Sequence, residues 1–526
     1  MLKISEDSLD WALKHIEKYG DTDIFPVPFE YKVIRYYWEN GLKQYLLDQD
    51  LLKWTVRPHR KLLTPKHKYG FRIATQLDPL DCILFTGLIY EIGADIENYR
   101  LHKEMRISFS NRFLPNKDGD MYDKEYNWNE FQKRSEELIE EIEDDIPLEQ
   151  YVVIADIADF FPRIYSHPLE NALSECTNKN NHVLKIKRMI SDWNYSVSYG
   201  IPVGQSATRL LAEMVLDDVD RALISEDIRH CRFVDDYRMF CKSKFEAYTN
   251  LAFLANTLFE NHGLTLQQHK TRILTAKEFR EIYLVSEDKK TINNLSEKFA
   301  DILRELDIDA YDAIVYGDIP EDVQEKIDAL NMIDILEEQI EMEEIDTRLV
   351  SFILTRMGRL DNSNAIDLCL DNIDKLYPVF KVVFNYINSL SCLTENEKAV
   401  YGSRLISMLD SSIVGHLEYH RTWVFDLFAN DQSWNSKDKY VGLINRYSDQ
   451  FSRRKLILAL GKSNNYSWFK SQKRNFDRFP DWEKRALLAA MSCLPGDEAQ
   501  HWYRSINNRL DVLEKYIAEW ALKEFN

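Results

Sequence analysis

Two adjacent carboxylates, Asp235 and Asp236, lie between two short strand-like runs, Arg232-Phe-Val and Tyr237-Arg-Met-Phe. Like charges held side by side in apolar surroundings are unfavourable unless a positive charge lies between them. We therefore predict a β-hairpin whose tip carries the pair and binds a divalent metal ion. The other Asp-Asp pairs, at 144–145 and 217–218, lie in acidic or helical surroundings that are typical of a solvated face.

Three further segments surround this pair in a fixed order along the chain. Asp156 ends the apolar run that begins at Tyr151, a Gly-Ile-Pro-Val-Gly turn at 200–204 opens a helical pattern, and Lys270 follows a short strand-like run. Nucleotidyl transfer uses two metal ions about 3.5–4 Å apart that clamp the attacking and leaving oxygens. Carboxylate oxygens suit Mg²⁺. We expect Asp156 and Asp235 to bridge the metals, Asp236 to support them and Lys270 to meet the triphosphate.

Composition limits the class of protein. The chain has 526 residues, enough for three or four structural units, and it has no apolar run long enough to cross a membrane. Its acidic first residues do not resemble a secretory signal. Seven scattered cysteines with no Cys-x-x-Cys spacing predict reduced thiols in a cytoplasm and argue against a zinc site. The net charge of −20 counts against general nucleic-acid binding, so local patches matter more.

Two basic stretches interleaved with aromatic residues are candidate anion sites. The stretch 53–72 contains seven Lys or Arg and no acid, and we select Arg57, Lys61 and Arg72 as triphosphate contacts. The stretch 453–478 contains eight Lys or Arg and one acid, a mixture that can follow a single strand by phosphate contact and stacking. The alternative is a solvated basic helix face with its aromatic rings in the core. The selected nucleic-acid contacts in this stretch are Arg454, Lys470, Lys473 and Arg474.

Taken in order, the four segments resemble motifs A to D of the right-handed palm of reverse transcriptases. Asp-Ile-x-x-Phe-Phe from Asp156 is similar to motif A, Gly-Ile-Pro-x-Gly from Gly200 to motif B, Phe-Val-Asp-Asp from Phe233 to motif C and Gly-Leu-x-Leu-x-x-x-Lys-Thr from Gly263 to motif D. The resemblance implies an RNA-directed DNA polymerase, a nucleotidyltransferase that uses two Mg²⁺ ions, with Mn²⁺ as the alternative metal. The implied metal ligands are Asp156, Ile157, Asp235 and Asp236, and the implied deoxynucleotide contacts are Asp159, Phe160, Phe161, Val203 and Gly204.

Two of these positions bear on substrate and template. Phe161 stands where the family places a steric gate against the ribose 2′-hydroxyl, so the resemblance implies deoxynucleotides. The alternative is a core phenylalanine, because Phe160 and Phe161 cannot both point into the site from one strand. Val203 replaces a glutamine that is usual in motif B, and this departure puts ordinary template reading in doubt.

The fold class implied is an α+β right-hand polymerase followed by an all-α helical-repeat domain. Helical patterns continue to the end of the chain after an acidic stretch, with a plain helical bundle as the alternative to stacked repeats. We divide the chain into an N-terminal helical extension (1–50), fingers and palm (51–285), a charged thumb-like connector (286–346) and the α-helical repeat domain (347–526).

A narrower resemblance comes from Gly20-Asp-Thr-Asp-Ile-Phe-Pro, from the run Phe109–Phe113 and from the helical C-terminus. These are similar to bacterial abortive-infection and related defence ("unknown group") reverse transcriptases. The resemblance implies a cytoplasmic bacterial protein of phage defence, without a membrane partner, that assembles as a homo-oligomer. It also implies template-independent synthesis primed from the protein, leaving single-stranded DNA covalently attached. Two alternatives remain: copying of a non-coding partner RNA, and a catalytically idle nucleic-acid-binding scaffold.

Overall fold

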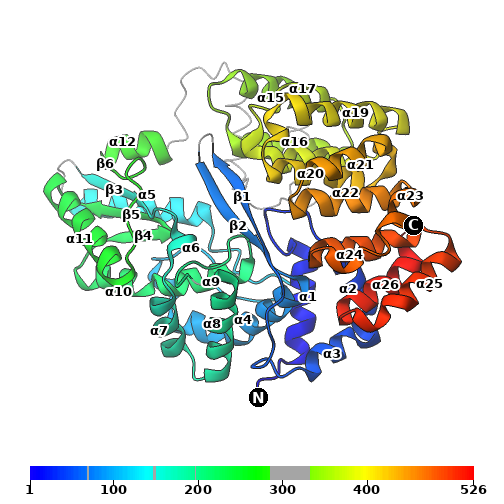
Figure 1. Ribbon diagram of the computed structural model, residues 1–526. Coiled ribbons are helices and arrows are strands. Elements are labelled where there is room, and N and C mark those ends of the chain that lie inside the picture. The colour runs from blue at the N-terminus through cyan, green and yellow to red at the C-terminus, as the bar shows by residue number, and fades with distance from the viewer. Residues whose placement is uncertain (68–69, 146–149, 196, 285–331, 526) are drawn as a thin grey trace.

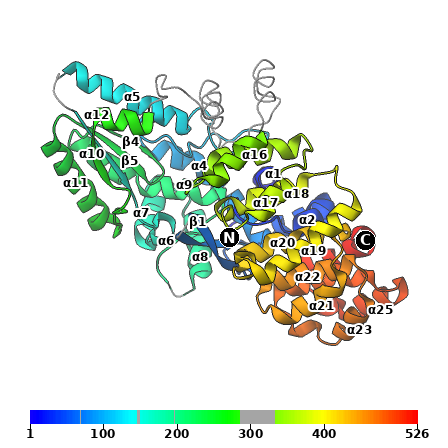
Figure 2. The ribbon, with the colours of Figure 1, turned by 90° about the horizontal axis from the view of Figure 1, so that it is seen from above.

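The computed structural model describes residues 1–67, 70–145, 150–195, 197–284 and 332–525. Two lobes lie side by side, one containing a β-sheet and one made of helices, and a β-hairpin rises between them (Figure 1). The view from above separates the same two lobes (Figure 2). We call them the sheet lobe and the helical lobe.

A four-stranded antiparallel sheet forms the centre of the sheet lobe, in the order β4-β5-β3-β6. Its strands are β3 (Tyr151–Asp156), β4 (His230–Phe233), β5 (Asp236–Cys241) and β6 (Arg272–Thr275). The predicted hairpin is present, because β4 pairs with β5 and Phe233 lies opposite Asp236. On β3 and β5 successive side chains enter different cores, so both faces of the sheet are covered.

Two helices cover the two faces of this sheet. Helix α11 (Lys244–His262) packs on β3 and β5, and α5 (Trp128–Asp145) packs on β4 and β5. Most side chains of β3 and β5 are therefore buried, and Asp156 and Asp236 stand at the ends of these two strands. The other helices of the sheet lobe are α4 (Pro79–Tyr99), α6 (Phe160–Arg163), α7 (Ser166–Cys176), α8 (Asn180–Asn194), α9 (Ser206–Val215), α10 (Asp217–Ser225) and α12 (Ala276–Phe279).

The basic stretch 53–72 forms most of a separate two-stranded antiparallel sheet, β1 (Arg60–His67) and β2 (Gly70–Gln76). This hairpin is the one that rises between the lobes (Figure 1). It packs against α20 (Glu418–Asn430) of the helical lobe. The hairpin therefore touches both lobes.

The first fifty residues contain three α-helices, and they contact both lobes. They form α1 (Glu6–Tyr19), α2 (Glu30–Tyr37) and α3 (Lys43–Asp48). Ser5 caps α1 by accepting a hydrogen bond from the Ser8 N–H, so the helix begins at Glu6, three residues before Leu9, its first apolar residue. Helix α1 packs on α4 of the sheet lobe, whereas α2 packs on α26 (Val512–Glu524) near the end of the chain.

The helical lobe is a row of helices in which alternate members pack together. Contacts link α16 to α18, α18 to α20, α20 to α22, α22 to α24 and α24 to α26. Besides α20 and α26, the α-helices described in this lobe are α15 (Met332–Glu341), α16 (Thr347–Arg359), α17 (Ile366–Asp371), α18 (Phe380–Ser389), α19 (Glu395–Ser411), α21 (Lys437–Arg446), α22 (Gln450–Lys462), α23 (Tyr466–Gln472), α24 (Asp481–Ala490) and α25 (Gly496–Ile506). Residues 285–331, most of the predicted connector, lie outside the described residues.

None of the helices in the described ranges combines the length and the apolar character that crossing a membrane requires.

Candidate active site

Three aspartates meet where the sheet ends. Asp156 is the last residue of β3 and lies directly opposite Asp236, the first residue of β5. Asp235 precedes it in the turn, and its backbone carbonyl accepts a hydrogen bond from the Ile157 N–H at 3.1 Å. Residues 79 positions apart in sequence are therefore adjacent because β3 and β5 are neighbouring antiparallel strands.

The charge of these carboxylates is not fully balanced. Burial, followed by the negative charge of Asp156, raises the pKa of Asp235 to about 6. Burial also raises the pKa of Asp236 to about 6, although the Arg238 guanidinium acts in the opposite direction. A pKa above the ordinary carboxyl value means that the ionised pair is held in unfavourable surroundings.

Lys270 supplies one positive charge at this site. Its Nζ lies 3.0 Å from Asp156 Oδ1, while half of the lysine side chain remains exposed. The backbone helps to place it, since the Gln267 N–H donates to the Asp156 carbonyl at 2.7 Å and the Lys270 N–H donates to the Gln267 carbonyl. The structure therefore brings the fourth predicted segment to the same strand end as the first and third.

The oxygen donors suit a hard cation. Throughout the described residues, no three His, Cys, Asp or Glu side chains are arranged closely enough to hold a metal ion as they stand. Asp156, Asp235 and Asp236 nevertheless offer hard oxygen ligands, and the raised pKa values of the last two indicate that more positive charge would be favourable there. These residues fit Mg²⁺ by donor chemistry and by charge.

The aromatic pair after Asp156 lies on a short helix and not on a strand. Asp159 adopts a left-handed conformation (φ +49°) and precedes α6. Phe160 and Phe161 are therefore the first two residues of a helix, and their side chains point in different directions from its axis. Phe160 is buried in the core at 2% exposure, whereas Phe161 is only partly buried. The burial of Phe160 argues against the deoxynucleotide contact expected there and leaves Phe161 as the aromatic candidate.

The turn at 200–204 is tied to two other segments. The Val203 carbonyl accepts from the Thr75 N–H of β2 at 3.1 Å, and the Gly204 carbonyl accepts from the Asp23 N–H at 3.2 Å. Gly204 has φ +116°, and an added Cβ would lie 3.2 Å from the Thr22 Cβ, so glycine is required by both conformation and space. The segment 20–25 and the hairpin together fix this turn.

The three predicted triphosphate contacts have different surroundings. Arg57 forms ion pairs with Asp78 at 3.1 Å and with Asp511 at 2.5 Å, so it joins the lobes, and its contact with a triphosphate stays a prediction. Lys61 is exposed on β1 with its Nζ 5.9 Å from the centre of the Tyr195 ring, and Arg72 is partly buried on β2.

Lys66 is a candidate that the sequence analysis did not select. It is exposed on β1, and its charge lowers the pKa of Asp235, which places it close to the aspartates. The signal was its membership of the basic stretch 53–72, but the sequence does not reveal which of seven cations approaches the site.

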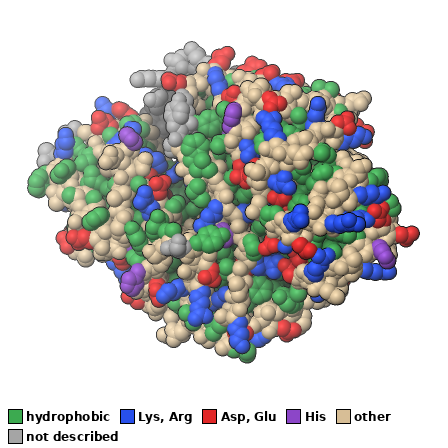
Figure 3. Space-filling model, viewed as in Figure 1, with side chains coloured by type: hydrophobic (Ala, Val, Ile, Leu, Met, Phe, Trp, Pro, Cys, Tyr) green, Lys and Arg blue, Asp and Glu red, His purple; other side chains and the backbone are tan. Residues whose placement is uncertain are grey.

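The predicted nucleic-acid contacts in the helical lobe divide by exposure. Arg454 is 1% exposed and pairs through both terminal nitrogens with Glu30, so its burial contradicts the expected contact. Lys473 and Lys470 both face Glu498, and Arg474 is exposed. On the face shown, acidic and basic side chains are interspersed over this lobe (Figure 3). Lys470, Lys473 and Arg474 remain open to solvent or partly so, and their contact with nucleic acid stays a prediction.

A buried polar network beneath the aspartate turn was also missed. It contains Ser110 and Glu213, and neither is among the site residues predicted from the sequence. The only sequence signal was a glutamate inside an otherwise apolar helical run.

The comparisons with known proteins agree with this geometry at the level of a domain family. Residues 112–300 match the family described as reverse transcriptase (RNA-dependent DNA polymerase). No curated protein sequence matches the chain.

Solved structures that are similar at low identity include apo telomerase from Candida tropicalis (11% identity, TM-score 0.35, covering 78% of this chain and 73% of that one). A form of that telomerase truncated from its C-terminal domain gives 13% identity and a TM-score of 0.31, covering 50% of this chain and 57% of the other. Telomerase from Candida albicans in complex with a telomeric RNA fragment gives 10% identity and a TM-score of 0.33, covering 79% of this chain and 71% of the other. Since these scores are low, we draw no argument from them.

The family match spans the segments that carry Asp156, Asp235, Asp236 and Lys270, and these are the residues that the sheet brings together. The chain contains a reverse transcriptase domain.

Proposed function

We propose that this chain is a Mg²⁺-dependent DNA polymerase of the reverse transcriptase type. The observation that carries the proposal is the meeting of Asp156, Asp235 and Asp236 at one strand end, with pKa values of about 6 for the last two. Carboxylates that repel one another in a partly buried site are typical of functional sites that bind cations.

Each residue has a separate task in this proposal. The three aspartates, with the backbone of Ile157, would hold two Mg²⁺ ions. When bound, the ions supply positive charge to the attacking and leaving oxygens of phosphoryl transfer. Lys270, whose Nζ lies 3.0 Å from Asp156 Oδ1, would stabilise the departing pyrophosphate. Lys66, Lys61 and Arg72 on the β1–β2 hairpin would meet the triphosphate, and the charge of Lys66 already lowers the pKa of Asp235.

The choice of deoxynucleotides rests on Phe161. Phe160 is occupied in the core, so the partly buried Phe161 ring is the one available to exclude a ribose 2′-hydroxyl. The backbone turn at Val203 and Gly204, held by Thr75 and Asp23, would form the opposite wall.

We further propose that synthesis is template-independent and primed from the protein, in a bacterial phage-defence system. Support comes from the resemblance of residues 20–30 and 109–113 and of the helical lobe to defence enzymes, and from the apolar Val203 where a glutamine is usual. The product would be single-stranded DNA attached covalently to a homo-oligomeric, cytoplasmic enzyme.

The test incubates the purified chain with each labelled deoxynucleoside triphosphate, singly and together, with Mg²⁺ and no added nucleic acid. Label attached to the wild-type protein, and absent from Asp235→Ala, is the expected result. Asp118→Ala is the matched control, because Asp118 is an exposed aspartate in another turn. A ribonucleotide series with Phe161→Ala tests the selection of deoxynucleotides.

The alternatives have their own outcomes in the same experiment. Synthesis that begins only after RNA is added would contradict template independence and favour copying of a partner RNA. No incorporation with or without RNA, at any Mg²⁺ or Mn²⁺ concentration, would refute the polymerase and favour a nucleic-acid-binding scaffold.

A further inference from the structure

The turn that carries Asp235 contains a strained residue. Val234 joins β4 to the aspartate pair and has φ +55°, in the left-handed region. A β-branched side chain rarely adopts this conformation, because it crowds the neighbouring carbonyl. Such a residue persists only when its surroundings fix it, and the strain is then a guide to function.

Two side chains hold Val234 from opposite sides. Its backbone N–H donates to Ser110 Oγ at 2.8 Å, and its carbonyl accepts from an Arg232 terminal nitrogen at 2.7 Å. Both polar groups of the strained residue are therefore occupied, and neither bond is part of the strand ladder.

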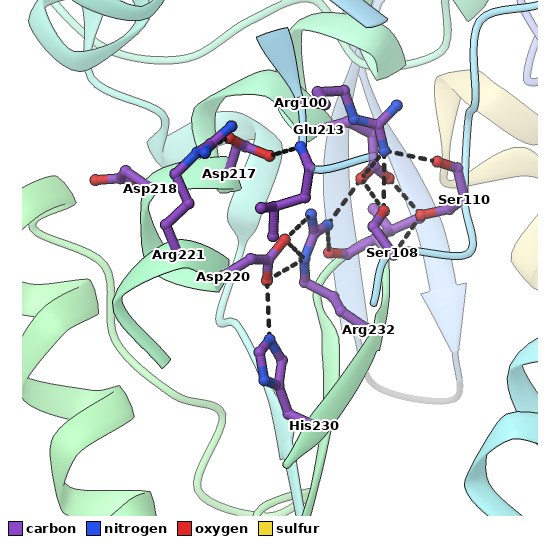
Figure 4. Close-up of polar contacts among 12 residues, drawn as sticks. Arg100, Ser108, Ser110, Glu213, Asp217, Asp218, Asp220, Arg221, His230 and Arg232 are labelled. Atoms are coloured by element: carbon purple, nitrogen blue, oxygen red, sulfur yellow. Dashed lines mark hydrogen bonds and ion pairs between the residues drawn. The ribbon is translucent and has the colours of Figure 1, made fainter. Parts of the chain in front are cut away.

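Glu213 of α9 connects these two clamps. One of its carboxylate oxygens accepts from Ser110 Oγ, and the other accepts from Arg232 at 2.8 Å. Figure 4 shows the serine and the arginine converging on this carboxylate. Glu213 is fully buried, and although burial alone would raise the pKa of its carboxyl group, the Arg232 and Arg100 guanidinium groups hold it below the ordinary value.

A second set of contacts fixes the network in place. A terminal nitrogen of Arg100 and the Ser108 hydroxyl each donate to the same Glu213 oxygen at 3.1 Å (Figure 4). Both carboxylate oxygens of Asp220 accept from Arg232 Nε at 3.0 Å. Arg232 is therefore held by two carboxylates, and paired charges of this kind keep a buried network in a single arrangement. Ser108 touches Glu213 but has no hydrogen bond to Val234, which separates its role from that of Ser110.

We propose that Glu213, acting through Ser110 and Arg232, is a positioning residue that sets the Asp235–Asp236 turn for metal binding. This deepens the proposed polymerase function and rests on it. Helix α9 begins directly after the turn at 200–204, so one rigid element carries both that turn and the support of the aspartates. The left-handed Val234 directs the two following carboxylates, and its two clamps prevent relaxation to an extended turn.

The test uses the affinity of the chain for Mn²⁺ alone, measured by calorimetry, together with single-nucleotide incorporation. Ser110→Ala should weaken Mn²⁺ binding at least tenfold and lower kcat at least tenfold, with KM for the nucleotide changed less than threefold. Ser174→Ala is the control, because Ser174 is an exposed serine of α7 whose hydroxyl donates to the Glu170 carbonyl, and it should stay within twofold of wild type. Asp235→Ala should abolish tight binding.

A rescue variant separates positioning from general stability. Glycine adopts φ +55° without strain, so Val234→Gly combined with Ser110→Ala should restore Mn²⁺ affinity to within threefold of wild type. Thermal midpoints of all variants show whether folding is intact. Equal effects of Ser174→Ala and Ser110→Ala, or failure of the glycine to rescue a folded double variant, would overturn the proposal.

The two hypotheses fail differently. A wild-type chain that binds Mn²⁺ but incorporates no nucleotide refutes the polymerase, while Ser110→Ala still reports on positioning through its metal affinity. A wild-type chain that does not bind Mn²⁺ refutes the positioning of a metal site. An active wild type with an unaffected Ser110→Ala refutes positioning alone.

Discussion

The buried ion pair between Glu30 and Arg454 gives a sharp test of how the lobes are joined. The two residues are 424 positions apart and are 0% and 1% exposed in their side chains. Phe29 and Trp482 place their rings 5.0 and 4.9 Å from the Arg454 guanidinium. Arg454→Met removes the charge but keeps a long apolar side chain, so the loss reports on the ion pair.

The size of the effect can be worked from these contacts. Removing one partner of a buried pair costs about 3–5 kcal/mol, because the remaining charge is uncompensated. Arg485 lies 3.8 Å from Glu30 and supplies part of the missing charge, which favours the lower end of that range. The lost contacts to the two rings add about 0.5–1 kcal/mol each. We expect a total of about 4 kcal/mol.

Urea unfolding followed by tryptophan fluorescence measures this loss, with Trp482 close to the altered residue. The double variant Glu30→Met/Arg454→Met should recover most of the stability, since an apolar pair of similar volume replaces two buried charges. Arg474→Met, on an exposed residue of the same basic stretch, is the matched control and should change stability by less than about 0.5 kcal/mol. A loss below about 1 kcal/mol in Arg454→Met, or a double variant as weak as the single one, would refute the reasoning.

Two further predictions follow from named contacts. Lys270→Gln removes the cation 3.0 Å from Asp156, so kcat for nucleotide incorporation should fall about 10²-fold in steady-state assays, and a change confined to KM would contradict its role at the pyrophosphate. Burial and the neighbouring Asp449 raise the pKa of Glu418 from 4.5 to about 7. Between these two values the folded state keeps a proton that the unfolded state has lost. The free energy of unfolding therefore falls as the pH rises from about 4.5 to about 7. Glu418→Gln should therefore make the thermal midpoint depend less on pH between pH 5 and pH 7.5. An unchanged pH dependence would contradict the raised pKa of Glu418.

The sequence was most informative where chemistry and local structure coincide. Asp156 follows a short apolar run, and the Asp235–Asp236 pair separates two strand-like runs. Strand ends of this kind are recognisable without knowledge of tertiary contacts. The hairpin β4–β5 and the all-helical C-terminal region follow the predicted pattern. A shared metal site implied that Asp156 lies close to Asp235, and the pairing of β3 with β5 brings the two residues together.

Charge patterns were the least informative, because their partners are remote. Arg454 and Arg57 belong to basic stretches that suggest anion binding, yet Glu30 and Asp511 neutralise them from the other end of the chain. No local pattern distinguishes a cation that faces solvent from one that is buried against a carboxylate more than 400 positions away. The surroundings of Phe160 were hidden for a different reason, since β3 ends at Asp156 and the left-handed Asp159 begins a short helix that buries the Phe160 ring.

The contact between α2 and α26 has a consequence for synthesis of the chain. The surface of α2 that receives α26 emerges early from the ribosome, but its partner is made almost five hundred residues later. Until α26 is made, the apolar face of α2 has no permanent cover, and until Arg454 is made the carboxylate of Glu30 lacks its ion-pair partner, a situation that favours chaperone binding over early folding. A chain truncated before residue 511 would therefore leave this face of α2 uncovered, and quality control would act on it before an incomplete protein accumulates.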